Sequence, residues 1–311
     1  MPQEKTYSQM QTSFTAQFYN YIVPKLKKYE YERFIRILII IGLSVLVIII
    51  GISILPINQS LTCNKYSREL GLAIASFIAP FYIYSFFKKS FERGIKKKIM
   101  PIICNCFPNL EWTTGAYNAN FIFKNSYLID NYDSTSFDDI FKGQFKNVNF
   151  DIVKGEFIKN YFTRFETIVF KGVIVKLDFN KKFIGHTVIR PNSMLPLSFS
   201  DDLQYTQFED AEFEKQFGVF TDDEIEAHDL ITSSFMKQLD EIKVAFKVDY
   251  ISCAFYEKHL LIALSTSKDL FSICSLFKKI DDPKQFFTMF EEILSIIKLI
   301  DHFKLNQKIG L

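Results

Sequence analysis

The chain has 311 residues, 48% of them hydrophobic, which is enough for one large domain or two smaller ones with a substantial core. Its formal net charge of +2 combines a basic part, with 14 Lys or Arg against 5 Asp or Glu in residues 1–109, and an acidic remainder, with 23 against 30. The acidic part would repel nucleic acid, which excludes nucleic-acid binding as an expected function, whereas the basic part suits anionic lipid headgroups.

Residues 1–36 predict an amphipathic helical segment. Apolar side chains recur there at steps of three and four residues and form one stripe: Phe14, Phe18, Ile22, Leu26 and Tyr29. Pro24 is expected to interrupt or kink this helix. The stripe either lies on a membrane surface or packs against a cytosolic domain, and packing is the more common arrangement.

A transmembrane helical hairpin is predicted for residues 37–99. The apolar stretches 37–57 and 70–87 would extend roughly 31 and 27 Å as helices, close to the ~30 Å hydrocarbon core of a bilayer. A membrane helix tolerates the kink expected at Pro80. The first stretch begins too late and is too long for a cleaved signal peptide, and buried core helices would carry a polar face.

The flanking charges predict the orientation of this hairpin. Five basic residues at positions 25–36 precede the first stretch and six at positions 88–98 follow the second, but the intervening turn has only Lys65 and Arg68. Since positive charge stays on the cytoplasmic side, we expect a multi-pass protein of the bacterial inner (cytoplasmic) membrane with both termini in the cytosol. Cys63 would then face outward, and four cysteines would lie in the reducing cytosol: Cys104, Cys106, Cys253 and Cys274.

The basic exit from the second stretch predicts a membrane-surface cluster of Lys88, Lys89, Arg93, Lys96, Lys97 and Lys98. On a continuing helix, four of these residues would lie close together on one side. Phe91 and Ile95 would then be available to dip into the interface. Anionic lipid is the expected ligand of this cluster.

Residues 100–311 predict an α+β cytosolic domain with a mainly antiparallel sheet and packed helices. Residues 147–158 alternate as a strand with Val148, Phe150 and Ile152 on one face. Residues 166–189 and 247–265 each predict a hairpin, turning at 180–182 and near 257–259. The inward face of the first hairpin would consist of Val173, Val175, Leu177 and Phe179.

Helix start signals occur twice in this domain. Thr221 followed by Glu224 predicts a capping box, with acidic residues in the first turn. Asp282 followed by Pro283 predicts the start of the final helix. That helix has a long apolar stripe from Phe286 toward Phe303.

The segments VFKGVIVKLDFNKKFIGHTVI and FEKQFGVFTDDEIEAHDLITSSFMKQL resemble an uncharacterised bacterial membrane-protein family, the domain-of-unknown-function family thirty-one thirty-seven. The resembling positions are Phe170, Lys171, Gly172, Phe179, Lys182, Phe183, Phe213, Phe217, Val219, Asp223 and Ala227. The resemblance implies an N-terminal helix, two membrane spans and a strand-rich C-terminal domain. It implies no activity and no catalytic residues.

The sequence has no glycine-rich phosphate loop, nucleophile elbow or zinc-protease helix, and it indicates no cofactor. A weak candidate metal or partner cluster consists of Asp222, Asp223, Glu224, Glu226 and His228. Glu224 and His228 share a helix face and would suit a divalent metal, but a solvated first helical turn explains the same residues. His186 would need an orienting carboxylate to act as a base, and the sequence identifies none.

Three functions therefore stay open. The first is a membrane-anchored cytosolic binding or scaffold module that engages a protein partner or anionic lipid and is not an enzyme. The second is a small channel or transporter accessory subunit that forms a homo-oligomer. The absence of an ionisable residue in either span argues against this function, because no polar pathway is evident. The third is an enzyme with an unrecognised site.

Overall fold

A computed structural model of the chain describes residues 6–54, 63–118, 120–129, 132–145, 148–161, 165–179, 182–194 and 202–305. These residues form two compact units. We call Thr12–Ile103 with Ser272–Phe287 the hairpin unit, and Met1–Gln11, Cys104–Phe271 and Thr288–Leu311 the sheet unit. Each unit is described by itself.

The helices are α1 (Tyr7–Gln17), a π-helical turn (Phe18–Ile22), α2 (Val23–Ile54), α3 (Cys63–Cys104), α4 (Asn120–Asn125), α5 (Ala211–Gln216), α6 (Glu224–Leu230), α7 (Ser233–Phe246) and α8 (Lys284–Leu305). The strands are β1 (Glu111–Thr113), β2 (Ser134–Phe145), β3 (Val148–Tyr161), β4 (Phe165–Asp178), β5 (Thr187–Pro191), β6 (Gln204–Thr206), β7 (Phe217–Thr221), β8 (Tyr250–Tyr256) and β9 (His259–Ser265). The predicted α+β class is confirmed.

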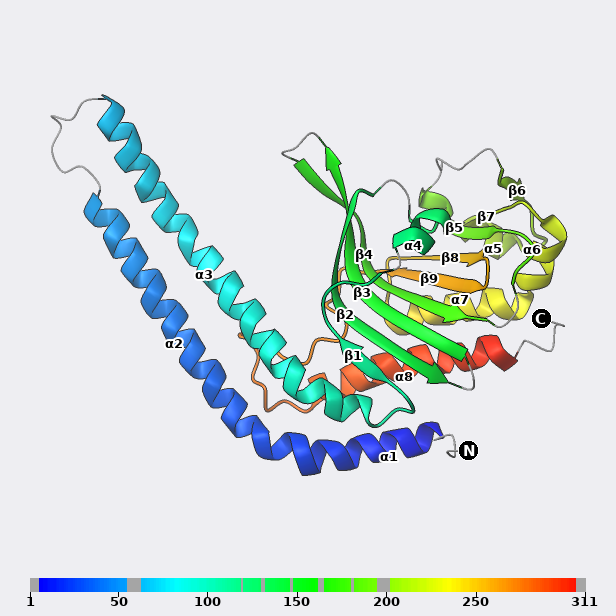
Figure 1. Cartoon of the computed structure of the whole chain (residues 1–311), viewed down its shortest axis with the longest axis horizontal. Helices are drawn as coiled ribbons and strands as arrows, with labels where there is room; N and C mark the ends of the chain where they lie inside the picture. The colour runs from blue at the N-terminus through cyan, green and yellow to red at the C-terminus, as the bar shows by residue number, and fades with distance from the viewer. Residues whose placement is uncertain are drawn as a thin grey trace. The chain divides into compact units, whose positions relative to one another are not determined.

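The nine strands form one antiparallel sheet in the order β1-β2-β3-β4-β9-β8-β5-β7-β6 (Figure 1). The predicted hairpin of residues 247–265 is confirmed, because β8 pairs with β9 and Tyr256 is opposite His259. The predicted hairpin of residues 166–189 is wrong. Its two strands do not pair, because the β8–β9 hairpin lies between β4 and β5 in the sheet. Asn180 and Lys181 of its expected turn lie outside the described residues.

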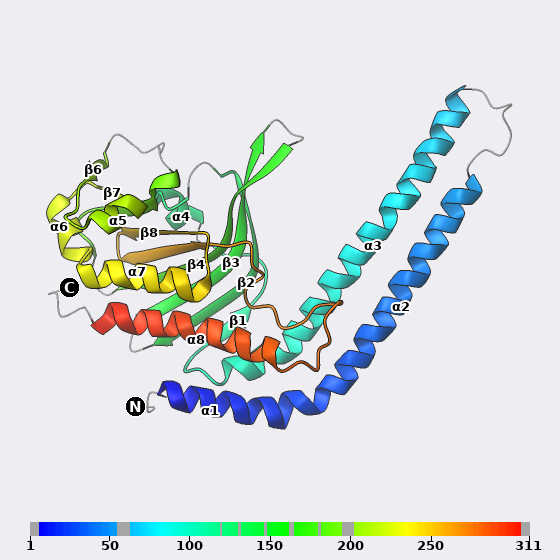
Figure 2. The same ribbon diagram turned by 180° about the vertical axis from the view of Figure 1, so that it is seen from behind.

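Both faces of the central strands are buried. Val173, Val175 and Leu177 of β4 are inaccessible to solvent, as expected, but the intervening Ile174 is only 1% exposed. On one face α7 and α8 cover the sheet (Figure 2), and Phe235 of α7 contacts Phe255 of β8. A sheet covered on both sides lacks the apolar–polar alternation of a half-exposed sheet.

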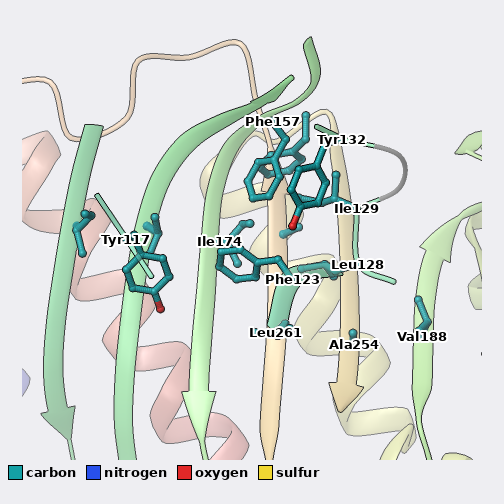
Figure 3. Packing of buried hydrophobic residues seen from close by; sticks show 14 of the residues in the cluster. Tyr117, Phe123, Leu128, Ile129, Tyr132, Phe157, Ile174, Val188, Ala254 and Leu261 are labelled. Carbon is teal, nitrogen blue, oxygen red and sulfur yellow. The ribbon is translucent and has the colours of Figure 1, made fainter. Parts of the chain in front are cut away.

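The opposite face carries an aromatic cluster centred on Phe157 of β3 (Figure 3). Its ring lies edge-on to those of Tyr132, Phe123 and Phe170 at centroid distances of 4.7, 5.7 and 5.6 Å. Phe157 is completely buried, so its replacement by Ala is expected to cost about 3–5 kcal/mol.

The N-terminal apolar stripe is buried, so packing and not surface exposure is the arrangement that the structure shows. Within the hairpin unit, Phe14 and Phe18 contact Phe287 with centroids 5.0 and 5.4 Å apart. The sequence predicted an interruption or a kink at Pro24, and the chain stays helical there, so the helix is not interrupted. A π-helical turn precedes Pro24, and Val23 donates its N–H to Phe18 O, so the extra residue in this turn accommodates a residue without an N–H.

Candidate membrane-binding site

Helices α2 and α3 have the composition and exposure of membrane helices. Among the described residues, the helices Tyr7–Ser53 and Leu70–Cys104 are long and apolar enough to cross a bilayer. Their large apolar side chains are exposed rather than buried, including Leu46, Ile49 and Phe77 at 53, 55 and 59%. In water such a surface would be costly, and in a bilayer it would be solvated by lipid tails.

The two helices run side by side in opposite directions (Figure 1). Near one end, Gly51 of α2 lies so close to α3 that an added Cβ would overlap Ser76 Oγ and Cβ. The Ser76 hydroxyl donates to Ala73 O at 2.6 Å, so its polarity is satisfied inside α3. Small residues at the contact allow close backbone approach, which is how helices associate in membranes.

Toward the other end, charged residues replace the apolar surface. The Arg36 guanidinium lies 5.2 Å from the centre of the Phe91 ring. Lys98 Nζ lies 5.2 Å from the Tyr29 ring and 3.6 Å from a carboxylate oxygen of Glu32. Arginine and lysine therefore link α2 to α3 where the apolar stretches end.

The structure divides the predicted basic cluster. Lys89, Arg93 and Lys97 are exposed and follow one another at four-residue steps, so they share one helix face. Lys98 is exposed, Lys88 is partly buried, and Lys96 is buried. Phe91 and Ile95 are also buried, at 0 and 1% exposure, so the expectation that they dip into the interface is wrong. The Phe91 ring is instead in contact with the Arg36 guanidinium of α2.

The segment Ser272–Phe287, a loop followed by the first residues of α8, is bound to α2 by hydrogen bonds. Arg33 Nη1 donates to Leu276 O at 2.6 Å, and Glu30 Oε2 accepts from Ile280 N at 3.0 Å. Glu30 and Arg33 also bond to each other, with 2.9 Å between Arg33 Nε and Glu30 Oε2. The Arg33 hydrogen bond is the main reason why the pKa of Glu30 lies below its ordinary value.

In the sheet unit, two residues of the acidic cluster hold one loop by hydrogen bonds. Asp222 accepts a hydrogen bond from His186 N at 2.5 Å. Glu226 accepts from Ile184 N and Gly185 N at 2.9 and 2.6 Å. Gly185 is required by space, because a Cβ there would lie 2.6 Å from Asp223 Cβ.

The predicted capping box is wrong. Asp223 is the N-cap of α6, and its side chain accepts from Glu226 N at 2.9 Å. Thr221 lies two residues earlier, at the end of β7, where its hydroxyl pairs with that of Thr187 on β5 at 2.9 Å. The same hydroxyl also donates to Asp223 O at 3.0 Å and accepts from Asp223 N at 3.1 Å, so it joins β5 to the N-cap residue and does not itself cap the first turn of α6.

Glu224 and His228 stay on the surface. Their closest N–O distance is 4.0 Å, and His228 packs on the Phe208 ring with centroids 4.4 Å apart. Across the described part of the chain, no group of three or more His, Cys, Asp or Glu side chains is placed to hold a metal ion.

Sequence reasoning missed a polar chain across three strands on the aromatic face of the sheet. Tyr117 Oη donates to Asp151 at 2.6 Å, Lys176 Nζ lies 3.5 Å from Asp151 and 2.8 Å from Asp178, and Asp178 contacts His259. Burial, followed by the nearby Asp151 charge, raises the pKa of Tyr117, so its hydroxyl remains protonated. These groups satisfy one another's hydrogen-bonding capacity. Only the register of the strands shows that they meet.

A second missed cluster surrounds Lys154 of β3. A bulge in β2 at Asp138 and Asp139 places both carboxylates 3.8 Å from Lys154 Nζ, which also pairs with Asp269. Burial acts to lower the pKa of Lys154, but these carboxylates outweigh it and raise the pKa. Lys154 therefore stays charged, and the cluster is an ion-pair network.

His186 is held between aromatic rings rather than by a carboxylate. Its Nε2 lies 3.0 Å from Ser126 O, and its ring stacks on Tyr127 with centroids 5.4 Å apart. Burial lowers the pKa of His186 despite this hydrogen bond. The imidazole is therefore neutral at physiological pH, and its visible contacts fix the loop in place.

The C-terminal part of the chain matches a known family model. Residues 168–305 match a family model described as protein of unknown function (DUF3137). These residues are similar to that family, and we call them the DUF3137 segment. The resemblance seen in the sequence is confirmed over these residues, and the DUF3137 segment begins in β4 and ends with α8. Comparison with the curated proteins gives no match.

Among solved structures, this chain is similar to the crystal structure of the mycobacterial trehalose monomycolate transport factor A, TtfA. The TM-score is 0.34 and the sequence identity 9%, over 62% of this chain and 88% of that chain.

Proposed function

We propose that the chain is a membrane-anchored binding module: α2 and α3 cross the bacterial inner membrane, both termini lie in the cytosol, and the DUF3137 segment binds a protein partner there. The observation that carries the proposal is the exposed apolar surface of two adjacent helices, followed by basic residues at one end. This arrangement favours an anchor over a channel, because residues 37–54 and 70–87 contain no Asp, Glu, Lys, Arg or His.

A binding role for this segment is supported by the surface around α6. Ile184 and Ile225 are 81 and 79% exposed, and Glu226 holds the backbone of Ile184 beside its own helix. The contact between Phe208 and His228 brings the segment before α5 next to α6. Exposed carboxylates before α5, in the first turn of α5 and on α6 define the acidic surface: Glu209, Glu212, Glu224 and Asp229.

Apolar residues rimmed by carboxylates suit a basic partner segment with an apolar anchor. Binding is favoured over catalysis because the buried polar groups described above bond to one another.

The anchor is tested by cysteine labelling in sealed spheroplasts. Cys63 should react with a membrane-impermeant maleimide, whereas a reporter cysteine from Lys237→Cys in a Cys63→Ser background should react only after permeabilisation. Lys237 is 79% exposed, and Cys104, Cys106, Cys253 and Cys274 are buried and should stay unlabelled. Cys63→Ser alone is the matched control. Labelling of the reporter in sealed cells would reverse the topology.

The binding role is tested by a photoreactive amino acid at Ile225, with Val244 as a control of similar exposure, 75%. A specific partner should crosslink at position 225 and not at 244. The adduct should disappear when Glu224 and Asp229 are replaced by Lys. Equal crosslinking at both positions would contradict a binding site at the acidic surface.

A further inference from the structure

One loop of the hairpin unit exposes an aromatic ring although its backbone is held tightly. Phe277 is 76% exposed, and Lys278 and Lys279 beside it are exposed as well. The residues on either side of these three, Leu276 and Ile280, are 1 and 0% exposed. The loop is therefore anchored on both sides of its exposed tip.

Hydrogen bonds define the shape of this tip. Lys278 N donates to Ser275 O at 3.3 Å, and the two residues form an isolated antiparallel bridge. Arg33 binds Leu276 O before the tip, and Glu30 binds Ile280 N after it. Because Arg33 and Glu30 both belong to α2, the tip has a fixed height along that helix.

The tip lies beside the end of the predicted membrane span of α3. The Phe277 ring stacks on Tyr84 of α3, with centroids 5.2 Å apart and planes inclined by 30°. Tyr84 belongs to the apolar stretch 70–87, one helical turn before Lys88. The Arg36–Phe91 contact lies further along α3, beyond Lys88. Phe277 therefore lies beside the last apolar turn of α3, on the side of the basic exit.

We propose that the tip formed by Phe277, Lys278 and Lys279 is a second membrane contact, in which the Phe277 ring inserts between lipids of the cytosolic leaflet and the two lysines bind anionic headgroups. This inference rests on the proposed function, because it takes α3 to cross the membrane. If Tyr84 lies at the bilayer interface, the ring stacked on it lies there too. An aromatic ring flanked by ammonium groups suits that environment, where the ring leaves water and the charges meet phosphate.

The tip also has the chemistry of a lipid contact rather than of a protein interface. Its two lysines are positively charged, and so are the partly buried Lys88 and the exposed Lys89, which follow Tyr84 by about one helical turn on α3. An anionic leaflet neutralises all of them at once. Lys residues are depleted in the centres of protein interfaces.

The test uses the full chain reconstituted in vesicles that contain lipids brominated near the headgroup end of the acyl chain. Phe277→Trp provides the probe, and the parent, with Trp112 as its one tryptophan, provides the baseline. Val244→Trp is the matched control, because Val244 is equally exposed. We expect at least twofold stronger quenching for Phe277→Trp than for Val244→Trp in anionic vesicles. Replacing Lys278 and Lys279 by Glu should reduce that quenching by half or more.

Resistance to alkaline extraction, measured on the same samples, separates the two proposals. Protein that resists extraction but shows no added quenching at position 277 would overturn the lipid contact and leave the anchor intact. Protein that is released by alkali would overturn the anchor and the lipid contact together. Quenching that is equal in anionic and neutral vesicles, and insensitive to the lysine replacements, would overturn the headgroup part of the proposal.

Discussion

Asp178 and His259 lie 81 residues apart in the chain and meet across β4 and β9, where Asp178 Oδ1 is 2.6 Å from His259 Nδ1. A carboxylate can only accept, so Nδ1 of His259 carries the proton. Lys176 Nζ bonds to both Asp178 oxygens, at 2.8 and 3.0 Å. Burial acts to raise the pKa of Asp178, but the hydrogen bonds from His259 and Lys176 outweigh it and lower the pKa.

Replacement of Asp178 by Asn should destabilise the sheet unit. His259, which is 6% exposed, and Lys176 would both lose the charged acceptor of their hydrogen bonds. We expect a loss on the order of 1–3 kcal/mol in the free energy of unfolding, measured by denaturant titration. Glu166→Gln, at an exposed position near the start of the same strand, is the control and should change stability little. An equal effect of both replacements would contradict a special role for Asp178.

The same contact predicts a pH dependence. Because the folded-state pKa of Asp178 is lowered, its stabilisation is complete above the pKa of an unfolded aspartate, about 3.9. It is lost as the pH falls through the lower folded-state value. Thermal melting from pH 6 to pH 3 should therefore show a steeper loss of stability in the parent than in Asp178→Asn. Parallel curves would show that Asp178 does not contribute.

Lys154→Met should be more destabilising than a surface charge removal. It deletes the ammonium that faces Asp139, whose side chain is 0% exposed. Breaking a buried ion pair from one side typically costs about 3–5 kcal/mol. Lys171→Met removes a more exposed pair with Glu156, 2.7 Å apart, and should cost about 1 kcal/mol or less.

The measurement for this pair of variants is urea unfolding. A third variant, Lys154→Met with Asp139→Asn, should recover part of the loss, because it removes the carboxylate charge that the lysine had faced. No recovery in the double variant would mean that the loss comes from packing of the lysine stem and not from charge.

Glu226→Ala should lower stability more than replacement of the exposed residues of α6 does. It removes the acceptor of Ile184 N and Gly185 N, and a loss of about 1–3 kcal/mol is expected. The double replacement of Glu224 and His228 by Ala should cost about 1 kcal/mol or less, because both side chains are exposed. Melting of the parent should be insensitive to chelators. A chelator-dependent melting temperature that the double replacement abolishes would instead establish a metal site.

Gly51→Leu should disturb the packing of α2 on α3. A side chain at Gly51 would overlap Ser76, whereas an added Cβ at Gly42 meets nothing within 4 Å, so Gly42→Leu is the matched control. Overpacking a helix contact typically costs about 1–3 kcal/mol. Thermal aggregation of the purified proteins in detergent should begin at a lower temperature for Gly51→Leu alone. The same onset for both variants would show that the Gly51 contact is not needed.

Local patterns in the sequence were enough to predict the features that depend on neighbouring residues. The apolar stretches of α2 and α3, the buried stripe from Phe14 to Tyr29, the β8–β9 hairpin and the start of α8 all follow from periodicity or turn chemistry. At the start of α8, Asp282 accepts from Lys284 N at 3.0 Å, as expected of a cap. The resemblance of the DUF3137 segment also came from the sequence, and it carried a fold but no site.

Only the tertiary structure decided which distant segments meet. Residues 166–189 contain two strands, but pairing with β9 and β8 keeps β4 and β5 apart, and no local pattern encodes that choice. Thr221 had the spacing of a helix cap, yet its hydroxyl pairs with Thr187 because β5 lies beside β7. Phe91 and Ile95 had the spacing of a lipid-facing pair but are buried.

The Asp178–His259 contact and the Phe277–Tyr84 stack depend on this same kind of information. Each joins residues whose separation along the chain is large, and their meeting is fixed by strand register in one case and by anchoring hydrogen bonds in the other. Periodicity reports which side of an element is buried. It does not report which other element covers that side, because the free energy that selects the neighbour arises from packing and pairing between elements.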